Sequence, residues 1–276
     1  MTGGGRLVLV GTPIGNMGDL APRAAEALAN ADVVACEDTR HTGRLLQRAG
    51  ISVPRLLSFH EHNEAARADE IIALLDDGQT IALVSDAGMP TVSDPGQRLV
   101  TAVGAAGHEV TAVPGPTAAV TALAVSGLPA ERWVMEGFLP RQGRERSERM
   151  AAIAGEPRTT LIYESPRRLG RTLSDLLAVA DHDRRVVVCR ELTKLHEEVW
   201  RGALGDAVQR WAGVDVKGEV VVVVGPAVAE EVDDDEILAA LTRARSDGLS
   251  ARDAAARVSE DLAVARNRVY RMAIYT

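Results

Sequence analysis

Residues 80–96 read TIALVSDAGMPTVSDPG, a strand-like run followed by a loop of unusual composition. The apolar segment 80–86 predicts a buried strand. The loop that follows, from Ser85 to Gly96, holds two acids, two glycines and two prolines. Proline fixes φ and glycine lets a backbone approach a ligand closely. These residues therefore predict a rigid, preformed pocket wall at the end of a strand.

Similar apolar runs on both sides of this strand predict a sheet. Within the first 126 residues, further strands are expected at 7–11, 32–37, 55–59 and 108–114. Amphipathic segments predict helices, for instance at 22–30 and 63–75. Asp94-Pro95 predicts another helix start, because Asp can cap a helix and Pro has a preset φ. Such alternation is typical of βα units around a mainly parallel sheet.

The pattern restarts after Gly127-Leu128-Pro129. Strands are expected at 133–139, 159–164, 185–190 and 219–225, with helices at 144–154 and 169–180. From residue 230 an acidic cluster precedes Ala- and Arg-rich helical sequence. We therefore expect an α/β protein with an N-terminal α/β domain at 1–127, a second α/β domain at 128–228 and a helical module at 229–276. The last part of the helical module contains Arg266, Arg268 and Arg271, so this part is expected either to contact RNA or to be a solvated helix packed on the rest of the protein.

The composition is that of a globular protein, and its charge limits how the protein can bind nucleic acid. Of the 276 residues, 46% are apolar and 25% are charged, which argues against a disordered or fibrous chain. The formal net charge of −8 disfavours indiscriminate attraction to nucleic acid, so any RNA contact must be local. Cys36 and Cys189 lie in separate apolar runs and are expected in the core. No apolar stretch approaches the roughly 20 residues that span a bilayer, so we expect a cytoplasmic protein.

Loops at the ends of the other predicted strands also carry ligand-binding features. The loop 10–19 lies between the first strand and the first helix, where α/β proteins place ligand-binding turns. Pro13 stands where a G-x-G-x-x-G motif needs its second glycine, and the ending of a P-loop is missing. Glu37 ends the second strand, where an acid can hydrogen-bond the ribose hydroxyl of a dinucleotide. This position therefore leaves a nicotinamide-dependent oxidoreductase as an alternative function. The small residues at 114–119, after the fifth strand, suit packing against a flat adenine ring.

Together these loops resemble one family over nearly the whole chain. The stretch from Ser85 to Gly96 is similar to the signature of the ribosomal RNA small subunit methyltransferase I family, within the tetrapyrrole methylase superfamily. Supporting strings are EDTR at 37–40, SFHEHN at 58–63, FLPR at 138–141, YESPRR at 163–168 and CRELTK at 189–194. The tail departs from the family, which often shows Gly-Leu-Ser where this chain has the segment 262–265.

The resemblance implies an activity, a cofactor and an assembly. It implies two α/β domains with S-adenosylmethionine in the cleft between them, a homodimer, and methylation of the 2′-hydroxyl of a decoding-region cytidine in 16S ribosomal RNA. The cofactor wall that it implies comprises Pro13, Ile14, Asp86, Gly88, Met89, Thr117, Ala118, Tyr163 and Leu192.

The implied reaction restricts the catalytic residues to groups that can accept a proton. A ribose hydroxyl is a poor nucleophile at neutral pH, so the enzyme must align its oxygen with the methyl carbon. A nearby carboxylate or neutral amine can then take the proton. The candidates are Glu37, Asp38, Glu164 and Lys194, and the sequence does not choose among them. The chemistry needs no metal, and the two histidines of His60-Glu61-His62 would point to opposite faces of an extended segment.

RNA contacts are expected from arginines and from a few aromatic rings. The candidates for phosphate contact are Arg40, Arg44, Arg141, Arg144, Arg146, Arg167 and Arg168, each of which is equally well explained as a solvated side chain. His60 suits either RNA contact or hydrogen bonding within its loop. Unstacked bases often stack on aromatic rings. Phe59, Tyr163 and Trp133 are the rings near the expected cleft, although Phe59 and Trp133 are better explained as core.

Two other functions stay open. A precorrin-type methyltransferase would share the cofactor pocket and differ in substrate, although the Arg-rich loops favour RNA. A non-catalytic RNA-binding factor for ribosome assembly would bind RNA without transferring a methyl group, which an activity measurement separates from both enzymes.

Overall fold

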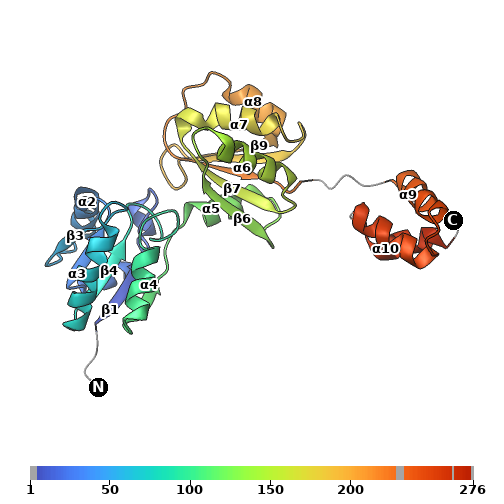
Figure 1. The fold of residues 1–276 in the computed structure, drawn as a ribbon. Helices are drawn as coiled ribbons and strands as arrows, with labels where there is room; N and C mark the ends of the chain where they lie inside the picture. Colours follow the sequence, from blue (N-terminus) through green and yellow to red (C-terminus); the bar gives the residue numbers. More distant parts are fainter. Residues whose placement is uncertain (1–4, 228–232, 263, 275–276) are drawn as a thin grey trace. The chain divides into compact units, whose positions relative to one another are not determined.

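The computed structural model describes residues 5–227, 233–262 and 264–274. The chain divides into two compact units, residues 1–227 and 228–276 (Figure 1). The larger unit contains two five-stranded sheets with flanking helices, and the smaller unit contains helices. The expected α/β class, with two sheets and a helical C-terminal segment, is confirmed. Across the described residues, no helix has both the length and the apolar character needed to cross a bilayer.

The first sheet is entirely parallel, with the strand order β3-β2-β4-β1-β5. Its strands are β1 (Arg6–Val10), β2 (Val33–Cys36), β3 (Leu56–Ser58), β4 (Thr80–Val84) and β5 (Glu109–Val113). The connecting helices are α1 (Pro22–Ala29), α2 (Thr39–Ala49), α3 (Glu64–Asp76) and α4 (Gln97–Ala105). A short 3-10 helix, Met17–Asp19, follows β1.

The helices of this part cover both faces of the sheet. Residues of α1 and α2 such as Leu28 and Leu46 are buried against one face. Ile71 of α3 and Leu99 of α4 are buried against the other face. The loops after the neighbouring strands β1 and β4 therefore lead to helices on opposite faces, which opens a crevice at the carboxyl ends of these strands. In open α/β sheets, this point is where ligands bind.

The second sheet is mixed, with the order β6-β7-β10-β8-β9. Its strands are β6 (Trp133–Phe138), β7 (Thr159–Glu164), β8 (Arg185–Arg190), β9 (Glu198–Ala203) and β10 (Val220–Val224). Strands β6 and β7 are parallel, whereas β10 pairs antiparallel with β7 and β8, and β8 with β9. The helices of this part are α5 (Ala118–Ser126), α6 (Arg144–Gly155), α7 (Leu169–Leu177) and α8 (Leu204–Trp211), and a short 3-10 helix, Pro166–Arg168, precedes α7.

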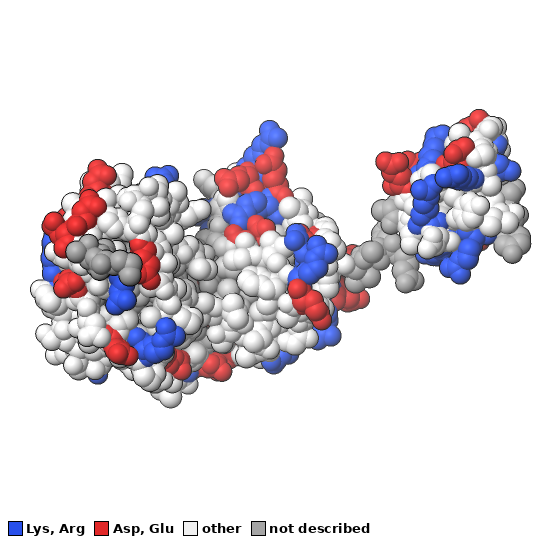
Figure 2. Space-filling model, turned by 90° about the horizontal axis from the view of Figure 1, so that it is seen from below, with Lys and Arg blue, Asp and Glu red and all other residues white. Residues whose placement is uncertain are grey.

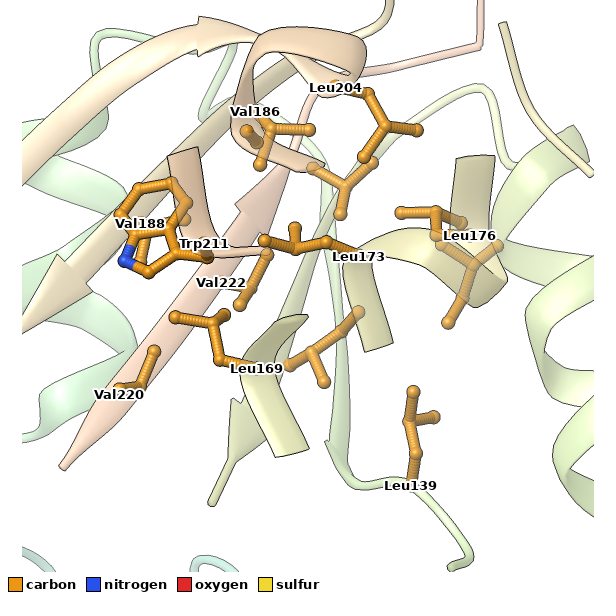
Figure 3. Close-up of a cluster of buried hydrophobic side chains, with 14 of the residues drawn as sticks. Leu139, Leu169, Leu173, Leu176, Val186, Val188, Leu204, Trp211, Val220 and Val222 are labelled. Atoms are coloured by element: carbon orange, nitrogen blue, oxygen red, sulfur yellow. The ribbon is translucent and has the colours of Figure 1, made fainter. Parts of the chain in front are cut away.

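Each face of the second sheet has its own apolar core. Figure 3 shows the first of them, in which Leu169, Leu173 and Trp211 pack against the valines of β8 and β10. On the other face, Ala122 and Leu123 of α5 pack with Val187 and Val223 of the sheet. Ile14, from the loop after β1, joins this second core. The first loop is thus anchored by burial on the second sheet.

The C-terminal unit is a small helical body with a core of its own. It contains α9 (Asp234–Ser246), α10 (Ala251–Asp261) and α11 (Arg266–Ala273), with Ile237, Leu241 and Val269 fully buried. The acidic cluster begins α9, where the Asp233 side chain accepts a hydrogen bond from Glu236 N and caps the helix. On the face seen in Figure 2, arginine side chains gather over these helices beside a group of acidic ones. The interpretation of the cluster as a helix N-terminus is confirmed.

Some predicted details of the fold are wrong. Helix α4 begins at Gln97 and not at Asp94-Pro95, because the buried Glu64 accepts a hydrogen bond from Gly96 N at 3.2 Å and stands in for a local cap. Trp133 is 38% exposed, since it begins β6 at the edge of the sheet, whereas Phe59 is buried as expected. Strand β9 and helix α8 were not anticipated, because the residues of this edge strand are only partly buried and its apolar pattern is weak.

Candidate functional site

A cavity of about 440 Å³ lies where the loops of the first sheet face the second sheet. Its wall contains residues that follow β1, β4 and β5, together with residues of β7, β8 and β10. The predicted wall residues Ile14, Asp86, Gly88, Met89, Thr117, Ala118, Tyr163 and Leu192 all line it. Pro13 lines a neighbouring cavity of about 360 Å³, which shares Ile14, Asp86 and Ala87 with the first one. The two cavities are adjoining parts of one cleft.

The loops after β1 and β4 are bonded to each other, so the cavity wall is preformed. Thr12 N donates to Gly88 O at 2.9 Å, and Gly88 N donates to Thr12 O at 3.2 Å. The buried Thr12 hydroxyl donates to Ser85 O at 3.3 Å. Because backbone and side chain both close this contact, the cavity wall is ordered before any ligand binds.

Glycines make the close approach of these loops possible. A Cβ added to Gly11 would lie 2.6 Å from the backbone of Gly115 and 2.8 Å from Met89 Sδ. Gly88 has φ of +86°, and its Cβ would lie 3.2 Å from Pro116 O. Any side chain at Gly11 would separate the loops after β1 and β5.

Among the residues that the structure describes, four non-glycine residues adopt positive φ, and all of them lie in loops beside the cleft. Thr91 and Ser93, in the loop after β4, have φ of 74° and 66°. Glu191 and Thr193, after β8, have φ of 52° and 67°. A β-branched threonine in this region costs roughly 1–3 kcal/mol and persists where the surroundings impose it. The Thr193 hydroxyl oxygen is also buried without a partner among the described residues, so this loop holds a polar group available to a ligand.

Three carboxylates converge beside the cavity. Asp86 and Asp94 line it, and Glu37 lies close enough to interact electrostatically with both. Burial, together with the nearby charges of Glu37 and Asp86, raises the pKa of Asp94 to about 6, against a hydrogen bond from Ser85 that lowers it. Burial and the charge of Asp86 likewise raise the pKa of Glu37. Such crowding favours a cation at the site and leaves Asp94 able to exchange a proton near neutral pH.

Tyr163 and Thr117 shape the opposite wall at the start of α5. The Tyr163 hydroxyl accepts a hydrogen bond from Ala119 N at 3.2 Å, and burial raises the pKa of this phenol. Thr117 caps α5 by accepting from Val120 N. The two side chains together satisfy free backbone N–H groups of the first turn of α5.

Glu164, a candidate for catalysis, is bonded on every side. Its side chain has no exposed surface, and it receives hydrogen bonds from Ser165 N at 2.6 Å and from the Thr172 hydroxyl at 2.6 Å. Arg168 forms an ion pair with it at 2.7 Å. The same Thr172 hydroxyl accepts from Arg146, whose guanidinium is buried and also bonds Asp175. Arg146 is therefore held inside the protein and is not exposed to a phosphate.

Lys194 and Asp38, two further candidates, also have close partners. Lys194 Nζ lies 3.0 Å from Glu191 and 2.8 Å from Glu219. Burial lowers the pKa of Lys194, but the hydrogen bonds to these two carboxylates outweigh it and raise that pKa overall. Asp38 caps α2 and pairs with Arg40, whose hydrogen bonds lower the pKa of Asp38 to about 2. Lys194 thus stays an ammonium and Asp38 a weakly basic carboxylate.

The candidate RNA contacts lie on different elements around the cleft. Arg141 and Arg167 are exposed and have no side-chain partner within the described residues, whereas Arg144 pairs with Glu148. Arg40 is exposed beside Asp38. His60 Nε2 accepts from Asn63 at 3.2 Å if Nδ1 carries the proton, and Nδ1 is buried without a partner among the described residues. Within the same residues, no three His, Cys, Asp or Glu side chains converge as a metal would require.

Phe138, which the sequence did not single out, is an exposed ring at the edge of the cavity. Its side chain is 58% exposed, lines the cavity and lies 5.5 Å from the Tyr163 ring. The register of β6 against β7 shifts between Met135 and Gly137, where Gly137 has φ of +64°. This bulge turns Phe138 toward the cleft. The FLPR string was the available signal, but strand alternation alone does not place the ring.

Comparison with known proteins places the fold and sequence in a family. Residues 6–208 match the family described as tetrapyrrole (corrin/porphyrin) methylases. A relative from Synechocystis sp., named ribosomal RNA small subunit methyltransferase I, is 43% identical, and the match covers 98% of each chain. Relatives of the same name from Escherichia coli O157:H7 and Mycobacterium tuberculosis are 43% and 44% identical, over 98% and 92% of this chain and 95% and 89% of theirs.

Solved structures support the fold. The crystal structure of uroporphyrin-III-C-methyltransferase from Thermus thermophilus aligns with a TM-score of 0.57 at 24% identity, covering 80% of this chain and 94% of that one. A cobalt precorrin-4 methyltransferase aligns with a TM-score of 0.61 at 15% identity and the same coverage. At these identities the similarity shows the fold alone.

Proposed function

The chain belongs to the ribosomal RNA small subunit methyltransferase I family of tetrapyrrole methylases, and from this membership we propose that it methylates the 2′-hydroxyl of a cytidine in the decoding region of 16S ribosomal RNA. The methyl donor in this proposal is S-adenosylmethionine. The observation that carries the proposal is the preformed cleft, in which eight of the nine predicted wall residues line one cavity with an acidic edge.

The residues of the cleft fit this donor in size and charge. A cavity of about 440 Å³ is within the range of small-molecule sites. Bound S-adenosylmethionine would supply a methyl group made electrophilic by a sulfonium cation. The carboxylates of Asp86 and Asp94 favour positive charge there, and the small residues Gly88 and Ala118 leave room for a flat ring. The unpartnered Thr193 hydroxyl lies beside Gly15 and is a candidate donor to the ligand.

We assign the proton acceptor to Asp94, with Glu37 beside it. A general base acts best when its pKa lies near the working pH, and the pKa of Asp94 is about 6. Glu164 and Lys194 then have structural roles. The Glu164 carboxylate is bonded to Arg168 and Thr172. The Lys194 ammonium is paired with Glu191 and Glu219. Asp38 orients α2, and its backbone N–H donates a hydrogen bond to Asp86 Oδ1 at 3.3 Å, which orients the Asp86 side chain.

Phe138 is in this proposal the ring on which a base stacks. Single-stranded bases stack on aromatic side chains, at a gain of roughly 1–3 kcal/mol per base. Arg149 donates to Phe138 O and to Glu136, which fixes the bulge that presents the ring. Arg141, Arg144 and Arg167 follow on the same part of the chain as candidate phosphate contacts.

The experiment that tests this function has two stages. Isothermal titration of wild type and Asp86→Ala with S-adenosylmethionine measures the donor site. Labelled methyl transfer onto small ribosomal subunits lacking the modification then measures the reaction. Label at a cytidine ribose, weakened in the variant together with donor affinity, supports the proposal. Donor binding without transfer to any ribosomal substrate would leave the fold and refute the function.

The alternatives differ in the second stage. Transfer to a tetrapyrrole and not to ribosomal subunits would favour a precorrin-type methyltransferase. RNA binding without any methyl transfer would favour an assembly factor. The homodimer stays a prediction, which light scattering of the full chain would measure.

A further inference from the structure

The part of the cleft next to the proposed donor site carries a row of basic side chains on α2. His41, Arg44 and Arg48 line the neighbouring cavity of about 360 Å³, together with Leu45. Their spacing of three, four and seven residues places them on one face of a helix. Thr42 and Leu46, on another face, are buried against the sheet. The row spans about 10 Å at 1.5 Å per residue.

The two arginines of this row have no ion-pair partner in the described part of the chain, although the carboxylates of Asp86 and Glu219 line the same cavity. Arg44 and Arg48 are exposed, and neither has a hydrogen bond or ion pair from its side chain within the described part of the chain. The other cation of the cavity, Lys194, is already paired with Glu191 and Glu219. In a chain of net charge −8, two adjoining unpaired arginines beside a cleft form a local positive site.

Helix α2, which carries the row, is bonded to the proposed donor site through Asp38. Asp38 caps α2 through hydrogen bonds from Arg40 N and His41 N, so the first turn is fixed. The N–H of Asp38 itself donates to Asp86 Oδ1 at 3.3 Å. The cavity lined by the row also shares Asp86 and Ala87 with the proposed donor site. Anything bound along α2 therefore lies next to the proposed donor site.

We propose that His41, Arg44 and Arg48 form a track for the phosphate backbone of the RNA strand that presents its ribose to the cleft. This inference rests on the proposed function and names the surface that orients its substrate. Arginine suits the role because its planar guanidinium bonds phosphate oxygens in pairs. Phosphate contacts set register without reading sequence, so the track positions the strand while other groups select the base.

The test compares Arg44→Glu/Arg48→Glu with the matched control Arg6→Glu/Arg185→Glu. The control arginines are exposed, have no side-chain partner among the described residues, begin strands β1 and β8, and line neither cavity. Affinity for a short cytidine-containing single-stranded RNA is measured between about 50 and 200 mM salt. We expect the track variant to bind at least about tenfold more weakly, with a salt slope shallower by about 1.4. The control should bind within about twofold of wild type, since exposed charges distant from the contact act weakly.

Three further measurements decide what the row contacts. Methyl transfer should show a raised KM for small subunits with kcat retained, and donor affinity by isothermal titration should be unchanged. A loss of donor affinity would assign the arginines to the carboxylate of the donor and overturn the track. Loss of a dimer with RNA affinity intact would make the row a subunit contact, which also overturns it. The milder Arg44→Gln/Arg48→Gln serves if charge reversal lowers the melting temperature.

The failure of the track and the failure of the proposed function give different results. If wild type neither binds RNA nor methylates ribosomal subunits, the function itself is refuted. If wild type does both and the track variant equals the control in affinity, KM and salt slope, only the track is refuted.

Discussion

Replacing Glu164 by Gln should destabilise the protein more than it slows the reaction. The carboxylate is fully buried and bonded by Ser165 N, the Thr172 hydroxyl and Arg168. Gln keeps an acceptor for Ser165 N but leaves the Arg168 guanidinium without its counter-ion. It also places an N–H₂ group against a hydroxyl that already accepts from Arg146. Removing one partner of a buried ion pair lowers the free energy of unfolding by about 3–5 kcal/mol. We expect about 3 kcal/mol here, because the hydrogen bond from Ser165 N is retained.

Calorimetry of the full chain measures this loss. For a unit of this size, about 3 kcal/mol corresponds to a melting temperature lower by roughly 6–12 °C. A double-mutant cycle with Arg168→Met isolates the pair, and we expect a coupling of about 1–3 kcal/mol because the second substitution removes the orphaned cation. An unchanged melting temperature combined with abolished methyl transfer would refute the reasoning and return Glu164 to the proton-transfer step.

Three further predictions concern the cleft. The kcat of the wild type should rise with pH around pH 6, because Asp94, whose pKa is about 6, must be ionised to accept a proton, and Asp94→Asn should abolish this rise. The wild type should also bind the donor more tightly above that pH. The same pH profile in both proteins would contradict the assignment. Phe138→Ala should raise KM for small subunits by roughly 5- to 150-fold, corresponding to 1–3 kcal/mol, while Phe138→Tyr stays near wild type; equal KM values for the two would remove the stacking role. Gly11→Ala should weaken donor binding, because its Cβ would meet Gly115 at 2.6 Å, whereas Gly104→Ala, with open space around its Cβ in α4, should bind normally and gain about 0.5–1 kcal/mol of stability.

The strands and the ligand-binding loops follow from local patterns in the sequence. Apolar runs such as 80–86 predicted strand β4 to within two residues, because a strand buried on both faces needs an unbroken apolar run. The loop from Ser85 to Gly96 was singled out by its prolines, glycines and acids, and it lines the cavity. The division at 127 and 228 stays a proposal about folding units, although the chain does separate into compact units after Ala227.

Contacts between distant segments decided the rest. The start of α4 depends on Glu64, which lies 32 residues from Gly96, and no local pattern reveals such a partner. Burial could not be deduced for Trp133 because it depends on β6 being an edge strand. Likewise, the raised pKa of Asp94 arises first from burial and then from the charges of Glu37 and Asp86, and only the packing of three loops brings these about. Hydrophobic periodicity and the residue types of turns act within a few residues, so they determine the helices, strands and loops of this chain. The pKa, the exposure and the direction of its side chains depend on neighbours from distant parts of the sequence, which only the tertiary structure brings close.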